Sequence, residues 1–257
     1  METDFVSVGL LSMYYMEMGT GKPIVFVHGN TASSLWYERV INIPGYHGLA
    51  PDMPCFGRSS PFDEEITIDR YSESIAGFMD VKGIKDAVVV GHSLGGCVVQ
   101  MLAINHPDLV KAMVLIDSGA PTGLVTPKDH HPFMQLMRTD RKVLEQALRA
   151  VVPTLKEEAF FQKLVDEAQL MAPQAWIGNA EALSHFDISS RCSEYRGSVL
   201  VIRGALDGLI TDEMAQQTAR AYSNAKLVTL DGIGHSVIVE DPALFQEILQ
   251  EFLAGIK

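Results

Sequence analysis

The sequence predicts a doubly wound α/β fold built on a mostly parallel sheet. Short β-branched runs alternate with stretches of helical apolar spacing along most of the chain. This alternation is typical of parallel sheets that are covered by helices on both faces. The 257 residues are 47% hydrophobic and 20% charged, which is enough for a sizeable core in a globular chain.

Eight strands are expected, and the first two form an opening hairpin. The strands are expected at residues 6–10, 12–18, 23–29, 46–51, 86–91, 111–117, 198–203 and 226–230. The run from residue 23 is short and continuously apolar, as buried parallel strands are. Between and after the strands, helical apolar spacing predicts helices at residues 68–81, 93–105, 212–222 and 242–256. The last of these has a proline at its start, where proline is favoured.

The alternation stops between residues 120 and 195, where no strand pattern is evident. Helical patterns occupy residues 140–152, 155–171 and 174–186, and prolines separate them. Ligands bind at the carboxyl edge of the strands in such sheets, so a helical insertion after the sixth strand predicts a lid over the site. We therefore expect a core domain of residues 1–120 and 196–257, with a helical cap at residues 121–195.

Charge and composition exclude several classes of partner. The net charge of −12 argues against binding nucleic acid or an anionic membrane surface. Three scattered cysteines, an acidic N-terminus and the lack of a run of about 18 apolar residues predict a cytoplasmic protein without a membrane span. Metal-ligand spacings and phosphate-binding glycine loops are not evident, so no metal and no cofactor is expected.

A G-x-S-x-G motif around Ser93 predicts the nucleophile. The motif follows the valine run at 88–90 and precedes a helical pattern. A sharp strand-to-helix turn exposes the serine hydroxyl, and the helix N-terminus behind it stabilises negative charge. The turn crowds the backbone, and Gly91, Gly95 and Gly96 relieve that crowding. The motif therefore predicts a nucleophile elbow.

A serine hydroxyl needs a base to take its proton and an acid to orient the base. His235, in the loop after the last strand, is the predicted base. Among the other histidines, His28 is expected to shape a loop and His92 to pack inside the elbow. Asp207 follows the seventh strand and is the predicted acid, while Asp117 at the end of the sixth strand remains a rival.

The oxyanion formed on an attacked carbonyl requires preorganised donors. The backbone N–H of Leu94, directly after the nucleophile, is the first predicted donor, and that of Asn30, after an early strand, is the second. The substrate pocket is expected to be largely apolar, for a small to medium substrate. Its candidate lining residues are Trp36, Phe133, Met134, Met137, Trp176, Phe186 and Ile238.

These motifs, in this order, resemble those of the α/β-hydrolase fold superfamily over essentially the whole chain. They are His28-Gly29-Asn30, Asp52-x-x-x-x-Gly57-x-Ser59, Gly91-His92-Ser93-Leu94-Gly95, Gly204-x-x-Asp207 and Gly234-His235. The resemblance implies an eight-stranded, mostly parallel sheet and a catalytic triad of Ser93, Asp207 and His235. It also implies that Asn30 and Leu94 supply the oxyanion hole. The resemblance does not identify the substrate, because proteins with this fold catalyse many different reactions.

Two departures from related patterns narrow the chemistry. The stretch His28-Gly29-Asn30, with Trp36 nearby, is similar to the oxyanion loop of haloalkane dehalogenases, whose nucleophile is an aspartate. Here the nucleophile is Ser93, and a serine alkoxide suits acyl transfer rather than halide displacement. Cys55 stands where relatives usually have glycine.

The leading hypothesis is a serine hydrolase that cleaves a carboxylic ester through an acyl-enzyme. A lactone is the nearest alternative substrate. Carbon–carbon hydrolysis of a vinylogous diketone is another, for which Arg138 and Arg141 are candidate partners of a substrate carboxylate. A ligand receptor with a vestigial hydrolase site belongs to a different class. A cofactor-free oxygenase or lyase would need His235 but not Ser93. The expected partner is a small-molecule ester or lactone.

Overall fold

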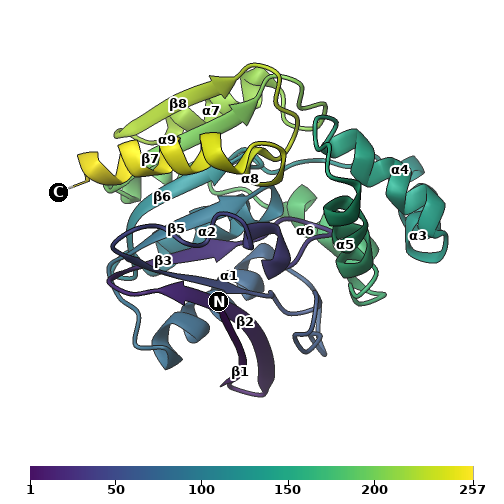
Figure 1. Cartoon of the computed structure of the whole chain (residues 1–257), viewed down its shortest axis with the longest axis horizontal. Helices are drawn as coiled ribbons and strands as arrows, with labels where there is room; N and C mark the ends of the chain where they lie inside the picture. The colour runs from purple at the N-terminus through teal and green to yellow at the C-terminus, as the bar shows by residue number, and fades with distance from the viewer. Residues whose placement is uncertain (257) are drawn as a thin grey trace.

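The computed structural model describes residues 1–256, and an eight-stranded sheet lies at its centre (Figure 1). The strand order is β1-β2-β4-β3-β5-β6-β7-β8. The strands are β1 (Glu2–Val8), β2 (Leu11–Gly19), β3 (Lys22–Val27), β4 (Tyr46–Pro51), β5 (Ala87–His92), β6 (Val110–Ile116), β7 (Ser198–Gly204) and β8 (Ala225–Leu230). Only the β1–β2 and β2–β4 pairings are antiparallel. The predicted eight-stranded, mostly parallel sheet is confirmed.

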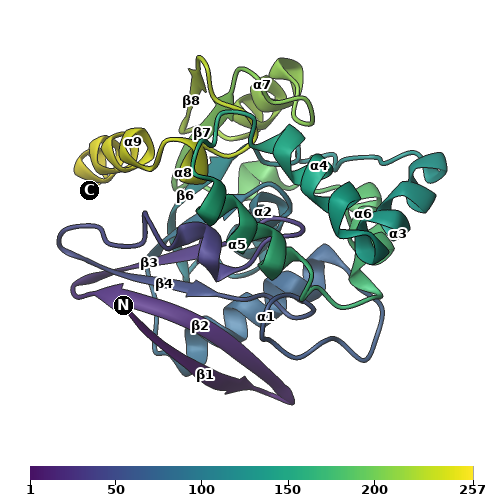
Figure 2. The same cartoon turned by 45° about the vertical axis from the view of Figure 1, so that its right-hand side comes forward.

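Helices cover both faces of this sheet. α9 lies on one face, and α1, α2 and α7 lie on the other (Figures 1 and 2). These helices are α1 (Ile68–Val81), α2 (Leu94–Asn105), α7 (Asp212–Ala221), the short α8 (Val237–Glu240) and α9 (Pro242–Gly255). Short 3₁₀ turns are η1 (Ser34–Tyr37), η2 (Lys128–His130) and η3 (Cys192–Glu194). Within residues 1–256, no helix is both long and apolar enough to cross a bilayer.

Four helices are inserted between β6 and β7. They are α3 (His131–Thr139), α4 (Arg141–Val151), α5 (Glu158–Ala168) and α6 (Ala175–His185). The sequence predicted the last three but not α3, a helix of nine residues none of which is buried. Its Pro132, which we expected to break a helix, lies in the first turn, where proline is tolerated. The division into core domain and cap stays a prediction.

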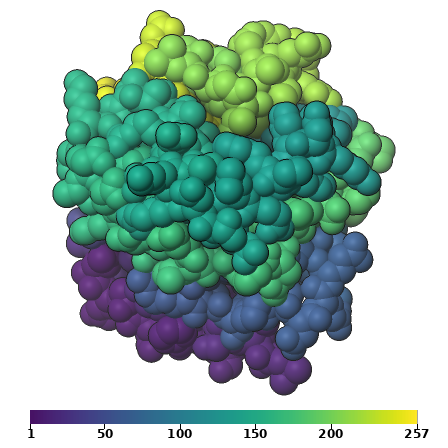
Figure 3. All heavy atoms as spheres, turned by 90° about the vertical axis from the view of Figure 1, so that its right-hand side faces the viewer, coloured from purple at the N-terminus to yellow at the C-terminus, as the bar shows by residue number. Residues whose placement is uncertain are grey.

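The loops that follow the parallel strands meet at one edge of the sheet. Parallel register places the carboxyl ends of β3 and β5 to β8 together. Ser93, Asp117, Asp207 and His235 follow β5, β6, β7 and β8 in turn, so the sequence places all four at this edge. The inserted helices lie over the same edge, and their atoms, teal to green, fill most of that face (Figure 3).

Candidate active site

The turn from β5 into α2 has the geometry of a nucleophile elbow. Ser93 has φ 53° and ψ −118°, a conformation that is strained for a residue with a side chain. Its N–H donates to the Ile116 carbonyl at 2.9 Å, which ties the elbow to β6. A Cβ on Gly95 would collide with the carbonyl oxygens of Val27 and His28. Glycine there lets α2 approach the end of β3.

His235 and Asp207 form a short, buried hydrogen bond. The Nδ1–H of His235 donates to Asp207 Oδ2 at 2.7 Å, and the two side chains are 6% and 0% exposed. Asp207 Oδ1 accepts from the backbone N–H groups of Leu209 and Ile210. Burial raises the pKa of Asp207, but the hydrogen bond and charge of His235 outweigh burial and hold this pKa below its ordinary value. The ionised carboxylate fixes the imidazole tautomer with Nε2 as the free nitrogen.

The loops that carry these two residues touch at a glycine. A Cβ on Gly204, at the end of β7, would collide with the Gly234 carbonyl oxygen next to His235. We expect Gly204→Ala to lower the free energy of unfolding by about 1–3 kcal/mol, because backbone atoms have to shift. Gly208→Ala is the matched control, since its Cβ would meet nothing within 4 Å. Urea unfolding of both variants checks this, and equal stabilities would contradict it.

Asp117, the rival acid, lies beside the pair but does not bond to the imidazole. Its Oδ1 accepts from the Gly204 N–H at 2.8 Å, and its buried Oδ2 has no hydrogen-bond partner within residues 1–256. Burial, with the nearby charge of Asp207, raises the pKa of Asp117 well above its ordinary value. Burial and charge therefore favour a proton on Asp117 rather than on Asp207, whose carboxylate faces His235.

One ligand atom from each of Asp117, Asp207 and His235 lies within 4.8 Å of the others, a spacing that a cation requires. Most of these atoms are already engaged. Both oxygens of Asp207 and one oxygen of Asp117 accept N–H groups. A cation would have to displace the His235–Asp207 bond, so these side chains fit the orientation of an imidazole better than a metal site.

His92 contributes a contact that sequence reasoning missed. Its Nε2–H donates to the backbone carbonyl of His235 at 2.8 Å, and the two ring centroids are 5.0 Å apart. Trp36 also stacks on the His92 ring, with the two ring centroids 5.5 Å apart. Burial, followed by the charge of His235, lowers the pKa of His92 to about 3, so the ring is neutral. His92 thus ties the elbow that carries Ser93 to the loop that carries His235.

The loop after β3 lies against the elbow. A Cβ on Gly29 would be only 2.9 Å from the Ser93 Cβ, so the two backbones are in close contact. His28 shapes this loop as expected, with Nδ1 bonded to the Gly29 carbonyl and Nε2 accepting from the Met53 N–H. Asn30 is the next residue, and its N–H has no acceptor within residues 1–256.

Leu94 is the first residue of α2, and the first N–H groups of a helix have no acceptor inside it. Its N–H and that of Asn30 are therefore both available to an incoming oxygen. The two donors come from the segments that meet at Ser93, since Leu94 follows Ser93 directly and Gly29 packs on it. Their role in an oxyanion hole stays a prediction.

The candidate pocket residues differ in their surroundings. Trp36 is buried and contacts His92, while Trp176 on α6 and Ile238 on α8 are buried. On α3, Phe133 is 50% exposed and Met137 is half-buried. Trp36 is thus the candidate that the structure brings to the elbow, and the assignment of the other four stays a prediction.

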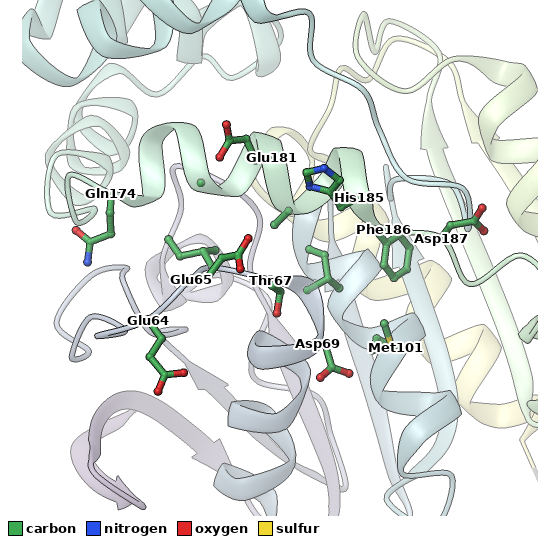
Figure 4. Close-up of a pocket in the computed structure, with 14 residues that line it drawn as sticks. Glu64, Glu65, Thr67, Asp69, Met101, Gln174, Glu181, His185, Phe186 and Asp187 are labelled. Atoms are coloured by element: carbon green, nitrogen blue, oxygen red, sulfur yellow. The ribbon is translucent and has the colours of Figure 1, made fainter.

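A cavity of about 470 Å³ lies between α6 and the start of α1 (Figure 4). Its lining includes Phe186, which the sequence placed in the substrate pocket, but neither Ser93 nor His235. Acidic side chains dominate its polar lining. They are Glu64, Glu65, Asp69, Glu181 and Asp187. This cavity is therefore separate from the elbow.

Polar contacts fasten the inserted helices to the loops of the site. The buried Glu167 of α5 accepts from the Ser33 hydroxyl at 2.8 Å and from both terminal nitrogens of Arg58 at 2.7 and 3.0 Å. The C-terminal carbonyl of α4, on Val151, accepts from the His235 N–H at 2.9 Å. The loop that carries the imidazole is thus held in part by the insertion.

Comparison with known proteins places this geometry in a family. A sequence model described as "Alpha/beta hydrolase family" matches residues 24–248. The chain belongs to the alpha/beta hydrolase family. Among curated relatives, this alpha/beta hydrolase is 28% identical over 264 residues to 2-hydroxymuconate semialdehyde hydrolase of Pseudomonas putida, with 93% of the chain and 89% of the relative covered.

Solved structures show the same fold in other members. An esterase from Exiguobacterium antarcticum superposes with a TM-score of 0.90 at 18% identity, covering 98% of this chain and 99% of the esterase. The enol-lactonase from Burkholderia xenovorans LB400 gives 0.88 at 20% identity, covering 98% and 100%. At these sequence identities the structural similarity shows a shared fold. The fold that the motifs implied is therefore confirmed.

Proposed function

We propose that this alpha/beta hydrolase cleaves carboxylic esters through an acyl-enzyme on Ser93. The observation that carries the proposal is the short buried bond between His235 and Asp207, on loops that converge beside the elbow. Such a pair orients an imidazole as a general base. The strained serine at a helix N-terminus is the matching nucleophile.

In the proposed reaction, the Ser93 oxygen attacks the ester carbonyl carbon while His235 Nε2 takes the hydroxyl proton. The carbonyl oxygen becomes an oxyanion, which accepts from the N–H groups of Asn30 and Leu94. Collapse breaks the bond to the alcohol oxygen, and the imidazolium returns its proton to that oxygen. His235 then deprotonates a water molecule, which attacks the acyl carbon, releases the acid and restores Ser93.

The apolar residues that we assign to the pocket favour a small to medium, largely apolar ester. Trp36, Trp176 and Ile238 are buried, and we assign them to the pocket together with Met137 and Phe133 of α3. The inserted helices cover the face above the elbow (Figure 3), and we propose that they act as its lid. Lactones fit the same site, because the reaction is unchanged except that the alcohol stays attached to the acyl chain.

Carbon–carbon hydrolysis receives less support from the two arginines considered for it. Arg138 donates to Gln135 on its own helix. Arg141 is engaged by Glu145 and Asp166, and further by two glutamine side chains. The Arg141 guanidinium is therefore not free to hold a substrate carboxylate, and Arg138 alone of the two keeps terminal nitrogens unbonded within residues 1–256, so we favour the ester.

Steady-state turnover of p-nitrophenyl acetate and butyrate by the purified chain tests this function. A hydrolase releases many equivalents of p-nitrophenol per protein without any partner, whereas a receptor with a vestigial site releases about one or fewer. The variants Ser93→Ala and His235→Ala should both lose turnover. Loss in the histidine variant alone would favour an oxygenase or lyase and contradict the proposal.

A further inference from the structure

A buried line of hydrogen bonds runs from α1 through α6 to the loop that carries Asn30. The Tyr71 hydroxyl of α1 lies 2.7 Å from Asn179 Oδ1 on α6. The Asn179 Nδ2 lies 2.8 Å from Asn30 Oδ1. Tyr71 and Asn179 are both 0% exposed, so the bond between them is shielded from water, whereas Asn30 is half-buried.

The direction of these bonds follows from the hydrogens available. The Tyr71 hydroxyl has one hydrogen, and Asn179 is its only partner within residues 1–256, so the hydroxyl donates to the Asn179 carbonyl oxygen. The other end of the Asn179 amide is then its NH₂ group. It donates to Asn30 Oδ1 and points its second hydrogen at Met171 Sδ, 3.6 Å away. The Asn30 carboxamide is thereby held with its oxygen toward α6.

Asn179 has a polar side chain at a buried position of α6, where a residue with only a packing role would be apolar. The other buried side chains of α6 are apolar, and they belong to Ala175, Trp176, Ala180, Ala182 and Leu183. Burying a carboxamide among such residues costs free energy unless its donors and acceptor are satisfied. Here they are satisfied by residues from outside the insertion, Asn30 and Tyr71, and by Met171, so the polar side chain links α6 to the core.

Asn30 is held by hydrogen bonds at its backbone carbonyl and at its side-chain oxygen. Its carbonyl accepts from the Thr31 hydroxyl at 2.7 Å, and its side chain is held by Asn179. Thr31 has φ 53°, so the backbone here is strained and needs such support. The backbone N–H of Asn30 remains without an acceptor within residues 1–256.

We propose that Asn179 is a positioning residue, which holds the Asn30 N–H in place for the oxyanion and is itself oriented by Tyr71. The inference rests on the proposed function, because it acts through the oxyanion donor assigned there. It also gives α6 a second role: when α6 is docked on the core, the donor is held in position. Opening of the insertion would release it.

Two substitutions test the link. Asn179→Ala removes the hydrogen bond to Asn30. Tyr71→Phe removes only the hydroxyl that orients Asn179. A donor displaced by about 1 Å costs about 100-fold in rate, so we expect kcat on p-nitrophenyl butyrate to fall about 10- to 100-fold in the first variant. In the second, where a single neutral hydrogen bond is lost, we expect a fall of about 3- to 10-fold. KM should change less than kcat in both variants, because the oxyanion donor binds the ester ground state less strongly than the transition state.

Tyr195→Phe is the matched control. Its hydroxyl is buried and bonded to the Val110 carbonyl at the amino end of β6, away from the elbow. Deuterium uptake of the peptide that contains residues 28–31 provides a readout independent of activity. It should rise in Asn179→Ala and Tyr71→Phe and stay unchanged in Tyr195→Phe.

The outcomes separate this inference from the proposed function. If Ser93→Ala is inactive while both test variants keep wild-type kcat and uptake, only the positioning role is overturned. Equal losses in Tyr71→Phe and Tyr195→Phe would also overturn it, since they would indicate general destabilisation. If Ser93→Ala keeps full activity, the proposed function fails, and the uptake at residues 28–31 still decides whether Asn179 holds the loop.

Discussion

Ser93→Ala is expected to lower kcat on p-nitrophenyl butyrate by about 10⁴-fold or more, because loss of the nucleophile removes the acyl-enzyme route altogether. KM should change little, since the pocket and the two N–H donors remain. The protein should stay folded, because Ser93 has no hydrogen bond from its side chain within residues 1–256 and is not buried.

Ser72→Ala is the control for this prediction. Ser72 is a buried serine on α1 whose hydroxyl has no hydrogen-bond partner within residues 1–256. Its removal takes the same atom from the protein without touching the elbow, so activity should be unchanged. A Ser93→Ala variant that retained more than about a tenth of the wild-type kcat would contradict a nucleophilic role for this residue.

Asp207→Asn and Asp117→Asn are expected to differ by orders of magnitude in activity. An amide at 207 presents an N–H to the imidazole and favours the wrong tautomer, so kcat should fall about 10⁴-fold. An amide at 117 keeps an acceptor for the Gly204 N–H and resembles the neutral acid, so kcat should stay within about threefold. Steady-state kinetics of the two variants checks this. Equal losses of kcat in the two variants would indicate that Asp117 acts as the triad acid.

The pH dependence of stability gives a separate check on Asp117. Its pKa is raised in the folded protein, so above the ordinary carboxyl pKa of about 3.9 the unfolded chain releases a proton that the folded chain keeps. This carboxyl therefore lowers the stability of the wild-type protein progressively as pH rises through that range and up to the folded-state pKa. Asp117→Asn removes the effect.

Urea unfolding at pH 5 and pH 8 measures this difference. The stability of Asp117→Asn relative to wild type should increase with pH. Asp69→Asn is a suitable control, because this carboxylate is on the surface at the start of α1. A stability difference between Asp117→Asn and wild type that is the same at both pH values would show that Asp117 is ionised in the folded protein.

Much of the fold could be predicted because its signals are local. The helix at 68–81 agrees with α1 at both ends, since Thr67 caps its N-terminus and the apolar spacing stops at Val81. The fully buried β5 is a plain valine run. α3 was missed although its apolar residues have helical spacing, because it is only nine residues long and has a proline in its first turn.

The site could be predicted only in part, for a related reason. Ser93, Asp207 and His235 are each marked by a short motif at the end of a strand. Asp207 is the predicted acid and Asp117 its rival, because both follow strand ends, and only the three-dimensional structure shows which one contacts the imidazole. The bond between His92 and His235 joins residues 143 positions apart, and no local pattern reports it.

The contacts between the inserted helices and the core could not be predicted from the sequence either. Asn179 and Asn30 are 149 positions apart, and Arg58 and Glu167 are 109 apart. Each pair consists of ordinary polar residues that sequence patterns assign to a solvated surface. The burial of Asn179 and Glu167, and therefore the importance of these contacts, becomes apparent only once α5 and α6 are packed on the core.

The central claim is that an acyl group is transferred to Ser93, and rapid acid quenching followed by mass spectrometry tests it most directly. Protein quenched during turnover of p-nitrophenyl butyrate should be heavier by one butyryl group, and peptide mapping should place that group on Ser93. The Ser93→Ala variant should acquire none. Full turnover without an adduct on Ser93, together with an active Ser93→Ala variant, would contradict the account.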